Sequence, residues 1–160
     1  MPIQPGETIP SAKLTEATPD GPRETSTDEI FGNKTAVLFG VPGAFTPTCS
    51  ARHLPSFVEG ADALKAKGVD VVACVAVNDA FVLNAWAKDQ GVENKVVMLA
   101  DGSGDFIRKL GLEMDLTARG LGIRSQRFAL VAKGGKVTHI GVEAPGAFEV
   151  SSATAMLGVL

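Results

Sequence analysis

Residues 127–142 read RFALVAKGGKVTHIGV, two β-prone runs on either side of Gly134-Gly135. A two-residue Gly-Gly connection is typical of tight hairpin turns, whose central residues need positive φ. We therefore predict an antiparallel strand pair over Arg127–Lys133 and Lys136–Val142. A final helix is predicted over residues 152–159.

The chain before this hairpin alternates between apolar runs and helical patterns. The runs TAVLFGV (35–41) and VDVVACVAV (69–77) are continuous and β-prone, as expected of strands buried on both faces. A shorter run lies at residues 96–100. We therefore predict three strands, at residues 35–41, 69–77 and 96–100. Helices are predicted between and after them, over residues 48–67, 80–90 and 104–110. The first of these helices carries one apolar stripe, formed by Leu54, Phe57, Val58, Ala61 and Leu64.

This order of elements predicts an α/β domain with a thioredoxin-like fold, in which helices flank a central mixed β-sheet. Strand–helix–strand units give parallel pairing, and the hairpin adds antiparallel strands. A flavodoxin-like fold has similar periodicity, but the hairpin before the last helix favours the thioredoxin-like one. A glycine-rich stretch leading to Arg124 carries no predicted element. Residues 1–33 read as an arm or edge strands, so residues 1–160 are expected to form a single domain.

The composition excludes several classes of protein. The net charge of -3 offers no basic surface for nucleic acid, and no run of about 18 apolar residues could span a membrane. The first ten residues lack the basic and apolar regions of a secretory signal. Two cysteines make no disulfide framework, so we expect a cytoplasmic location where thiols stay reduced.

Cys49 lies just after a predicted buried strand, where open α/β sheets place their ligand sites. Thr46 suits the N-cap position and Pro47 the first helical position, which puts Cys49 in the first turn. The unpaired amides and the helix dipole favour a thiolate there. A free cysteine is also commonly a small buried apolar residue, and placement alone leaves both interpretations open.

The run PGAFTPTCS (42–50) resembles, residue for residue, the active-site signature of type II peroxiredoxins, the peroxiredoxin-5-like subfamily that includes plant and bacterial glutaredoxin-dependent enzymes. Pro42, Thr46 and Cys49 meet the wider pattern Pro-x-x-x-Thr-x-x-Cys. The similarity extends to nearly all of residues 1–160, with further anchors at HLP (53–55), CVAVND (74–79) and RSQRF (124–128).

The resemblance implies a thiol-dependent peroxidase for hydrogen peroxide and alkyl hydroperoxides, active in antioxidant defence and redox homeostasis. Cys49 would attack the peroxide and become a sulfenic acid. Thr46, Arg127 and the Cys49 amide would stabilise the developing charge, and Pro42 would shield the thiolate. From the residues alone, Thr46 could equally be a helix cap and Arg127 a salt-bridge partner. No cofactor and no metal are implied.

His53 follows Cys49 by four residues, so the two side chains share a helix face. A Cys–His hydrolase pair is conceivable, but we expect His53 to orient the loop or to lie at an interface. Pro55 cannot donate the backbone bond that would reach Ala51, so we expect this helix to bend just after its first turns.

Cys74 lies in the middle of an apolar strand, where an inert buried cysteine is the usual outcome. Some plant-like relatives have a cysteine at the matching position, and a resolving role there remains the alternative. The chain has no cysteine near its C-terminus, where animal peroxiredoxin-5 places its resolving one. We therefore expect a one-cysteine cycle, with glutathione, glutaredoxin or thioredoxin reducing Cys49.

Other functions fit less well. A disulfide reductase needs a Cys-x-x-Cys pair, which is absent, and the two cysteines and two histidines show no metal-ligand spacing. A peroxide sensor in redox signalling could use the same motif. Such a sensor would be oxidised once, stoichiometrically, whereas an enzyme would consume peroxide catalytically with a thiol donor. By resemblance we also expect a homodimer, with apolar contacts from Ala44-Phe45, Asp79-Ala80-Phe81 and Gly120–Ile123.

Overall fold

Strands β8 (Phe128–Lys133) and β9 (Lys136–Val142) form the predicted hairpin in the computed structural model, which describes all residues from Met1 to Leu160. Gly134 and Gly135 both have positive φ, 60° and 80°, as a tight two-residue turn requires. The hairpin is therefore confirmed.

Three parallel strands make the centre of the sheet: β3 (Thr35–Gly40), β4 (Val71–Ala76) and β5 (Val97–Ala100). The seven strands follow the order β2-β1-β5-β4-β3-β8-β9, with β8 antiparallel to β3 and β1 antiparallel to β5. This mixed sheet, with the hairpin at one end, confirms the thioredoxin-like fold.

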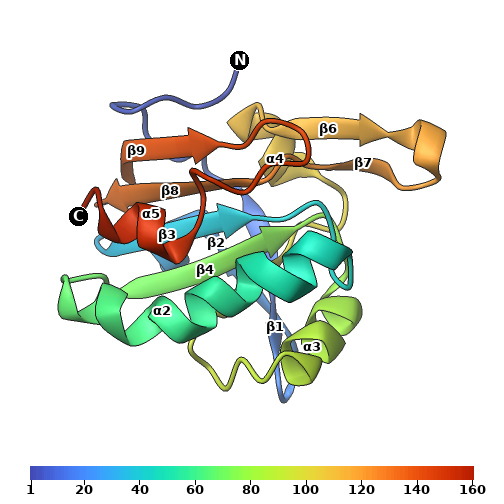
Figure 1. The fold of residues 1–160 in the computed structure, drawn as a ribbon, viewed down its shortest axis with the longest axis horizontal. Coiled ribbons are helices and arrows are strands. Elements are labelled where there is room, and N and C mark those ends of the chain that lie inside the picture. The colour runs from blue at the N-terminus through green and yellow to red at the C-terminus, as the bar shows by residue number, and fades with distance from the viewer.

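Helices cover both faces of the sheet, which explains the continuous apolar character of its central strands. They are α1 (Thr27–Phe31), α2 (Leu54–Ala66), α3 (Ala80–Asp89), α4 (Asp105–Leu110) and α5 (Ala153–Leu157). On one face, α2, α3 and α5 pack over a core that includes Phe57 and Trp86. On the other face, α1 and α4 enclose a second core around Phe31 and Phe106. Figure 1 shows α2 running along β4 on the first of these faces.

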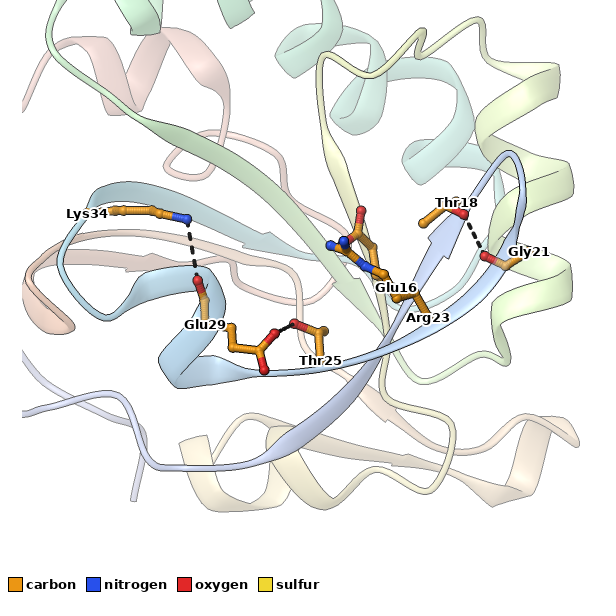
Figure 2. A network of polar contacts seen from close by, with 7 residues as sticks. All are labelled: Glu16, Thr18, Gly21, Arg23, Thr25, Glu29 and Lys34. Carbon is orange, nitrogen blue, oxygen red and sulfur yellow. Dashed lines mark hydrogen bonds and ion pairs between the residues drawn. The ribbon is translucent and has the colours of Figure 1, made fainter.

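Residues 13–26 form a hairpin at the opposite end of the sheet from β9. Strands β1 (Lys13–Thr18) and β2 (Gly21–Ser26) pair antiparallel, and Glu16 lies opposite Arg23 and forms an ion pair with it. The tight turn is closed by the Thr18 hydroxyl, which donates to the Gly21 carbonyl at 2.6 Å (Figure 2). The N-terminal arm thus extends the sheet through β5.

The glycine-rich stretch before Arg124, for which the pattern predicts no element, forms a two-stranded ribbon. Strands β6 (Glu113–Leu116) and β7 (Gly122–Ser125) pair antiparallel around the short 3-10 turn η2 (Thr117–Arg119). Figure 1 shows this ribbon projecting from the body of the domain. The strands are short and mostly half-exposed, so they carry little of the apolar periodicity that a strand prediction depends on.

Candidate active site

The loop before Cys49 leaves the C-terminal end of β3, beside the same end of β4. Val41 donates its backbone N–H to the Val75 carbonyl at 3.2 Å. Three residues further along the loop, the Ala44 amide donates to the Asn78 side-chain oxygen at 3.0 Å. The loop that leaves β3 is therefore braced by the end of the neighbouring strand β4, at the edge where α/β sheets place their sites.

Thr46 precedes the first helical residue, Pro47, and its carbonyl accepts the Ser50 amide at 3.0 Å. Its hydroxyl does not cap the helix; it donates to the Gly43 carbonyl at 2.7 Å. A hydroxyl has one proton, so Thr46 can only accept a hydrogen bond from a molecule bound beside it. Thr46 makes no hydrogen bond to the Cys49 sulfur in this structure.

The predicted helix over residues 48–67 begins with a π-helical turn, η1 (Cys49–His53), and continues as α2. The Leu54 amide donates to the Cys49 carbonyl, five residues back. Pro55 follows directly and has no N–H to donate to the Ala51 carbonyl. The turn before it is closed by the wider, five-residue hydrogen bond of a π-helix. The departure from α-helical geometry is therefore a π-turn that carries Cys49 and comes before Pro55, whereas the sequence predicts a bend after the first turns of the helix.

Arg127, the residue before β8, reaches the Cys49 sulfur across the sheet end. Its Nη2 donates to Cys49 Sγ at 3.2 Å, and Cys49 has 0% exposed surface. A guanidinium is always charged, so it stabilises negative charge on a sulfur at this distance, and burial reduces screening. The structure thus brings Cys49 and Arg127 together.

His53 contacts Arg127 and makes no hydrogen bond to Cys49. Its Nε2 lies 2.8 Å from the Ser151 carbonyl, which can only accept, so Nε2 carries the ring proton. Its Nδ1 therefore accepts from Arg127 Nη1, at 3.0 Å. His53 is accordingly a partner of the arginine, which agrees with an orienting role.

Aromatic rings enclose this histidine. The rings of Phe39, Phe57 and Phe148 lie 4.9, 5.6 and 5.1 Å from the imidazole, centroid to centroid. Burial, followed by the charge of Arg127, lowers the pKa of His53 to about 3. The imidazole therefore stays neutral at physiological pH and keeps its Nδ1 lone pair for Arg127.

Pro42 is half-buried at the start of the loop, and its carbonyl accepts from Arg124 Nη1 at 3.4 Å. The Nε of Arg124 also donates to the Leu121 carbonyl at 2.8 Å. Arg124 thus ties the projecting β6–β7 ribbon to the loop that leads to Cys49. The sequence motif includes Arg124, but only the structure gives it this position.

Cys74 is fully buried in the middle of β4, opposite Phe39 of β3. Burial, with the neighbouring Cys49 as a second cause, raises the pKa of the Cys74 thiol well above its ordinary value. Both cysteines are free. Cys74 therefore remains a protonated thiol inside the core, as its apolar strand predicts.

Sequence reasoning missed two contacts that support the site. The Trp86 indole donates to the Ser50 hydroxyl at 3.0 Å, beside Cys49. Glu143, after the end of β9, accepts the Ser151 hydroxyl at 2.6 Å and so holds the residue that contacts His53. Neither contact has a local sequence signal, since the first joins residues 36 positions apart and the second, 8 positions apart, closes an irregular loop.

No group of three or more His, Cys, Asp or Glu side chains is arranged to hold a metal ion. None of the helices combines the length and the apolar character that crossing a membrane would require.

The chain is similar to known proteins along almost its whole length. The model of the Redoxin family matches residues 4–157. Peroxiredoxin-2B of Arabidopsis thaliana is 46% identical over 160 residues, covering 99% of each chain. The chloroplastic peroxiredoxin-2E of the same plant is 47% identical over 99% of this chain and 69% of its own. The crystal structure of reduced Prx3 from Vibrio vulnificus in complex with hydrogen peroxide has a TM-score of 0.93 and 50% identity, covering 98% of each chain.

Proposed function

The chain belongs to the Redoxin family and is a peroxiredoxin, a thiol-dependent peroxidase of antioxidant defence. On that premise we propose which residue performs each step of the reaction. Cys49 is the peroxidatic cysteine and Arg127 its charge-stabilising partner. The observation that carries the proposal is the 3.2 Å hydrogen bond from Arg127 Nη2 to the buried Cys49 sulfur.

The substrates are hydrogen peroxide and alkyl hydroperoxides. The Cys49 thiolate attacks one peroxide oxygen, the O–O bond breaks, and the sulfur becomes a sulfenic acid. The leaving oxygen takes up a proton and departs as water or an alcohol. Negative charge passes from sulfur to the leaving oxygen, so the fixed Arg127 cation stabilises it throughout the transfer. The hydrogen peroxide named for the Vibrio vulnificus structure supports this choice of substrate.

Thr46 and Pro42 shape the place where the peroxide lies. Because the Thr46 proton is committed to the Gly43 carbonyl, its oxygen is free to accept the O–H of a bound hydroperoxide. Such a bond would hold the peroxide in line with the sulfur. Pro42, half-buried at the loop start, limits access of water to the thiolate. The role of Pro42 is the one that the family resemblance implies. For Thr46 the resemblance implies stabilisation of developing charge, whereas its hydrogen bond to Gly43 favours accepting a bond from the peroxide.

The second half of the cycle uses an external thiol. Glutathione, alone or through glutaredoxin, or thioredoxin attacks the Cys49 sulfenic acid, releasing water and forming a mixed disulfide. A second thiol then restores Cys49 and leaves with the first as a disulfide. Cys74 is a poor resolving residue because it is protonated, buried and held in the middle of a strand.

Cys49 is itself 0% exposed, so a bulky thiol reaches it only when the surrounding turn opens. The π-turn η1 is the segment that would open, since it carries Cys49 and lacks regular α-helical hydrogen bonds. Opening of this turn on oxidation would expose the sulfenic acid to the reductant.

Cys74→Ser is expected to retain peroxide turnover with glutathione and glutaredoxin, or with thioredoxin, in assays run side by side. The buried hydroxyl should cost about 1–3 kcal/mol of stability, so Cys74→Ala serves as the milder matched variant. Normal single-turnover oxidation followed by failed turnover in both variants would establish the two-cysteine alternative instead.

The active protein is proposed to be a homodimer that pairs through the face around the site. Three large apolar side chains on this face are exposed: Phe45 by 53%, Phe81 by 74% and Leu121 by 38%. They come from the three stretches that the family resemblance indicates. The hydrogen bonds of Asn78 and Arg124 described above join these stretches to one another, which supports a continuous surface.

Phe81→Glu is expected to weaken dimerisation by about 10-fold or more, because it places a charge in an apolar contact. Light scattering across a concentration series measures the change. Val159→Glu is the control, since Val159 is an exposed apolar residue near the C-terminus, outside the three stretches. A wild-type protein that stays monomeric at all concentrations would refute the dimer.

A cytoplasmic location is also proposed, because both cysteines are free and the cycle draws on a pool of reduced thiols. Cell fractionation tests it directly.

A further inference from the structure

The carboxylate of Glu143 fixes a segment of the chain next to the active site. This segment contacts site residues but takes no direct part in the chemistry. Glu143 is 8% exposed and accepts the backbone amides of Glu149, Val150 and Ser151, each at 2.9 Å. It also accepts the Ser151 hydroxyl at 2.6 Å. No Lys, Arg or His side chain forms an ion pair with it. A buried carboxylate with four donors and no countercharge fixes the backbone that supplies them.

The segment held in this way ends on His53. The Ser151 carbonyl accepts the Nε2 proton of His53, which fixes both the tautomer and the direction of the ring. The ring then offers its Nδ1 lone pair to Arg127 Nη1, 3.0 Å away. A guanidinium is a rigid planar fork, so holding Nη1 also determines where Nη2 points. Nη2 points at Cys49 Sγ.

We propose that Glu143 is a positioning residue for peroxide reduction, acting through Ser151, His53 and Arg127 on the Cys49 sulfur. The proposal rests on the function proposed above, since it assigns no new chemistry. Glu143 touches neither peroxide nor sulfur. Its contribution is to keep Arg127 aimed at the point where charge passes from sulfur to the leaving oxygen, a task that depends on preorganisation.

Glu143→Gln tests the proposal, because it keeps the shape of the side chain and replaces one acceptor oxygen by a donor that faces backbone amides. The rate of Cys49 oxidation by hydrogen peroxide is read by stopped-flow from the single tryptophan, Trp86, which contacts Ser50 beside Cys49. We expect the second-order rate constant to fall about 10-fold, because a guanidinium that is no longer held in place stabilises the developing charge less well. Glu59→Gln is the matched control, an exposed carboxylate on α2 with no hydrogen-bond partner, and should react at the wild-type rate.

Two further measurements separate positioning from general loss of structure. In a His53→Gln background, Glu143→Gln should slow the reaction by about twofold at most, because residues acting through one network are non-additive. Nitrogen NMR of the His53 ring should show the proton on Nε2 in the wild type and a mixture of tautomers in Glu143→Gln. If Glu143→Gln does not fold, Ser151→Ala removes only one donor to the carboxylate and should give a smaller slowing of the same kind.

Equal rates for Glu143→Gln and Glu59→Gln, or full additivity with His53→Gln, would overturn the positioning role. Failure of the proposed function looks different, since wild-type protein would then not be oxidised at Cys49 by peroxide at all.

Discussion

Cys49→Ser is expected to lose thiol-dependent peroxide consumption entirely, to the rate measured without protein. A serine hydroxyl is almost never ionised at neutral pH, so it cannot supply the nucleophile that breaks the O–O bond. The substitution changes one atom in a fully buried position, and the fold should persist. The measurement is peroxide consumption with glutathione and glutaredoxin, and separately with thioredoxin.

Cys74→Ser provides the comparison for this variant, because it makes the same substitution at the other cysteine. If the Cys49 variant kept turnover and the Cys74 variant lost it, the roles of the two cysteines would be reversed. If both kept it, neither cysteine alone would be required for the peroxidase activity, and the role proposed for Cys49 would be wrong. Continued turnover in the wild type also distinguishes the enzyme from a peroxide sensor, which would be oxidised once and stop.

Arg127→Met should slow the oxidation of Cys49 by about 10²–10³-fold, the loss typical of removing one donor aimed at developing charge in a buried site. The side chain keeps much of its apolar stem but loses both hydrogen bonds, to Cys49 Sγ and to His53 Nδ1. Stopped-flow mixing with hydrogen peroxide measures the rate independently of any reductant.

Arg127→Lys should give an intermediate rate, since it retains the charge but lacks the fork that contacts sulfur and imidazole together. Arg119→Met is the control, an exposed arginine on the turn η2 with no hydrogen-bond partner. Oxidation of Arg127→Met at the rate of this control would show that the guanidinium contributes nothing to the reaction.

The framework of the fold was predictable because its elements carry strong local patterns. Continuous apolar, β-prone runs indicate β3 and β4, one apolar stripe indicates α2, and Gly134-Gly135 indicates the terminal hairpin. The ribbon of β6 and β7 was not predictable, because its strands are short and half-exposed.

The site was predictable only in part, for a related reason. The position of Cys49 at a helix start follows from local sequence, and the family motif adds Arg127, which lies 78 residues further on. The missing N–H of Pro55 predicts a bend in the helix, but it does not predict the π-turn at Cys49–His53. Glu143 carries no pattern at all. Its importance comes from the segment folded around it, which exists only in three dimensions.

The central claim is that the Cys49 sulfur takes the oxygen from the peroxide and holds it as a sulfenic acid. The most direct test treats reduced wild-type protein with one equivalent of hydrogen peroxide and a sulfenic-acid trapping reagent of the dimedone type. Peptide mass spectrometry then locates the adduct. We predict an adduct on Cys49 and none on Cys74. An adduct on Cys74, or peroxide consumed with no adduct and no oxidation at Cys49, would contradict the account.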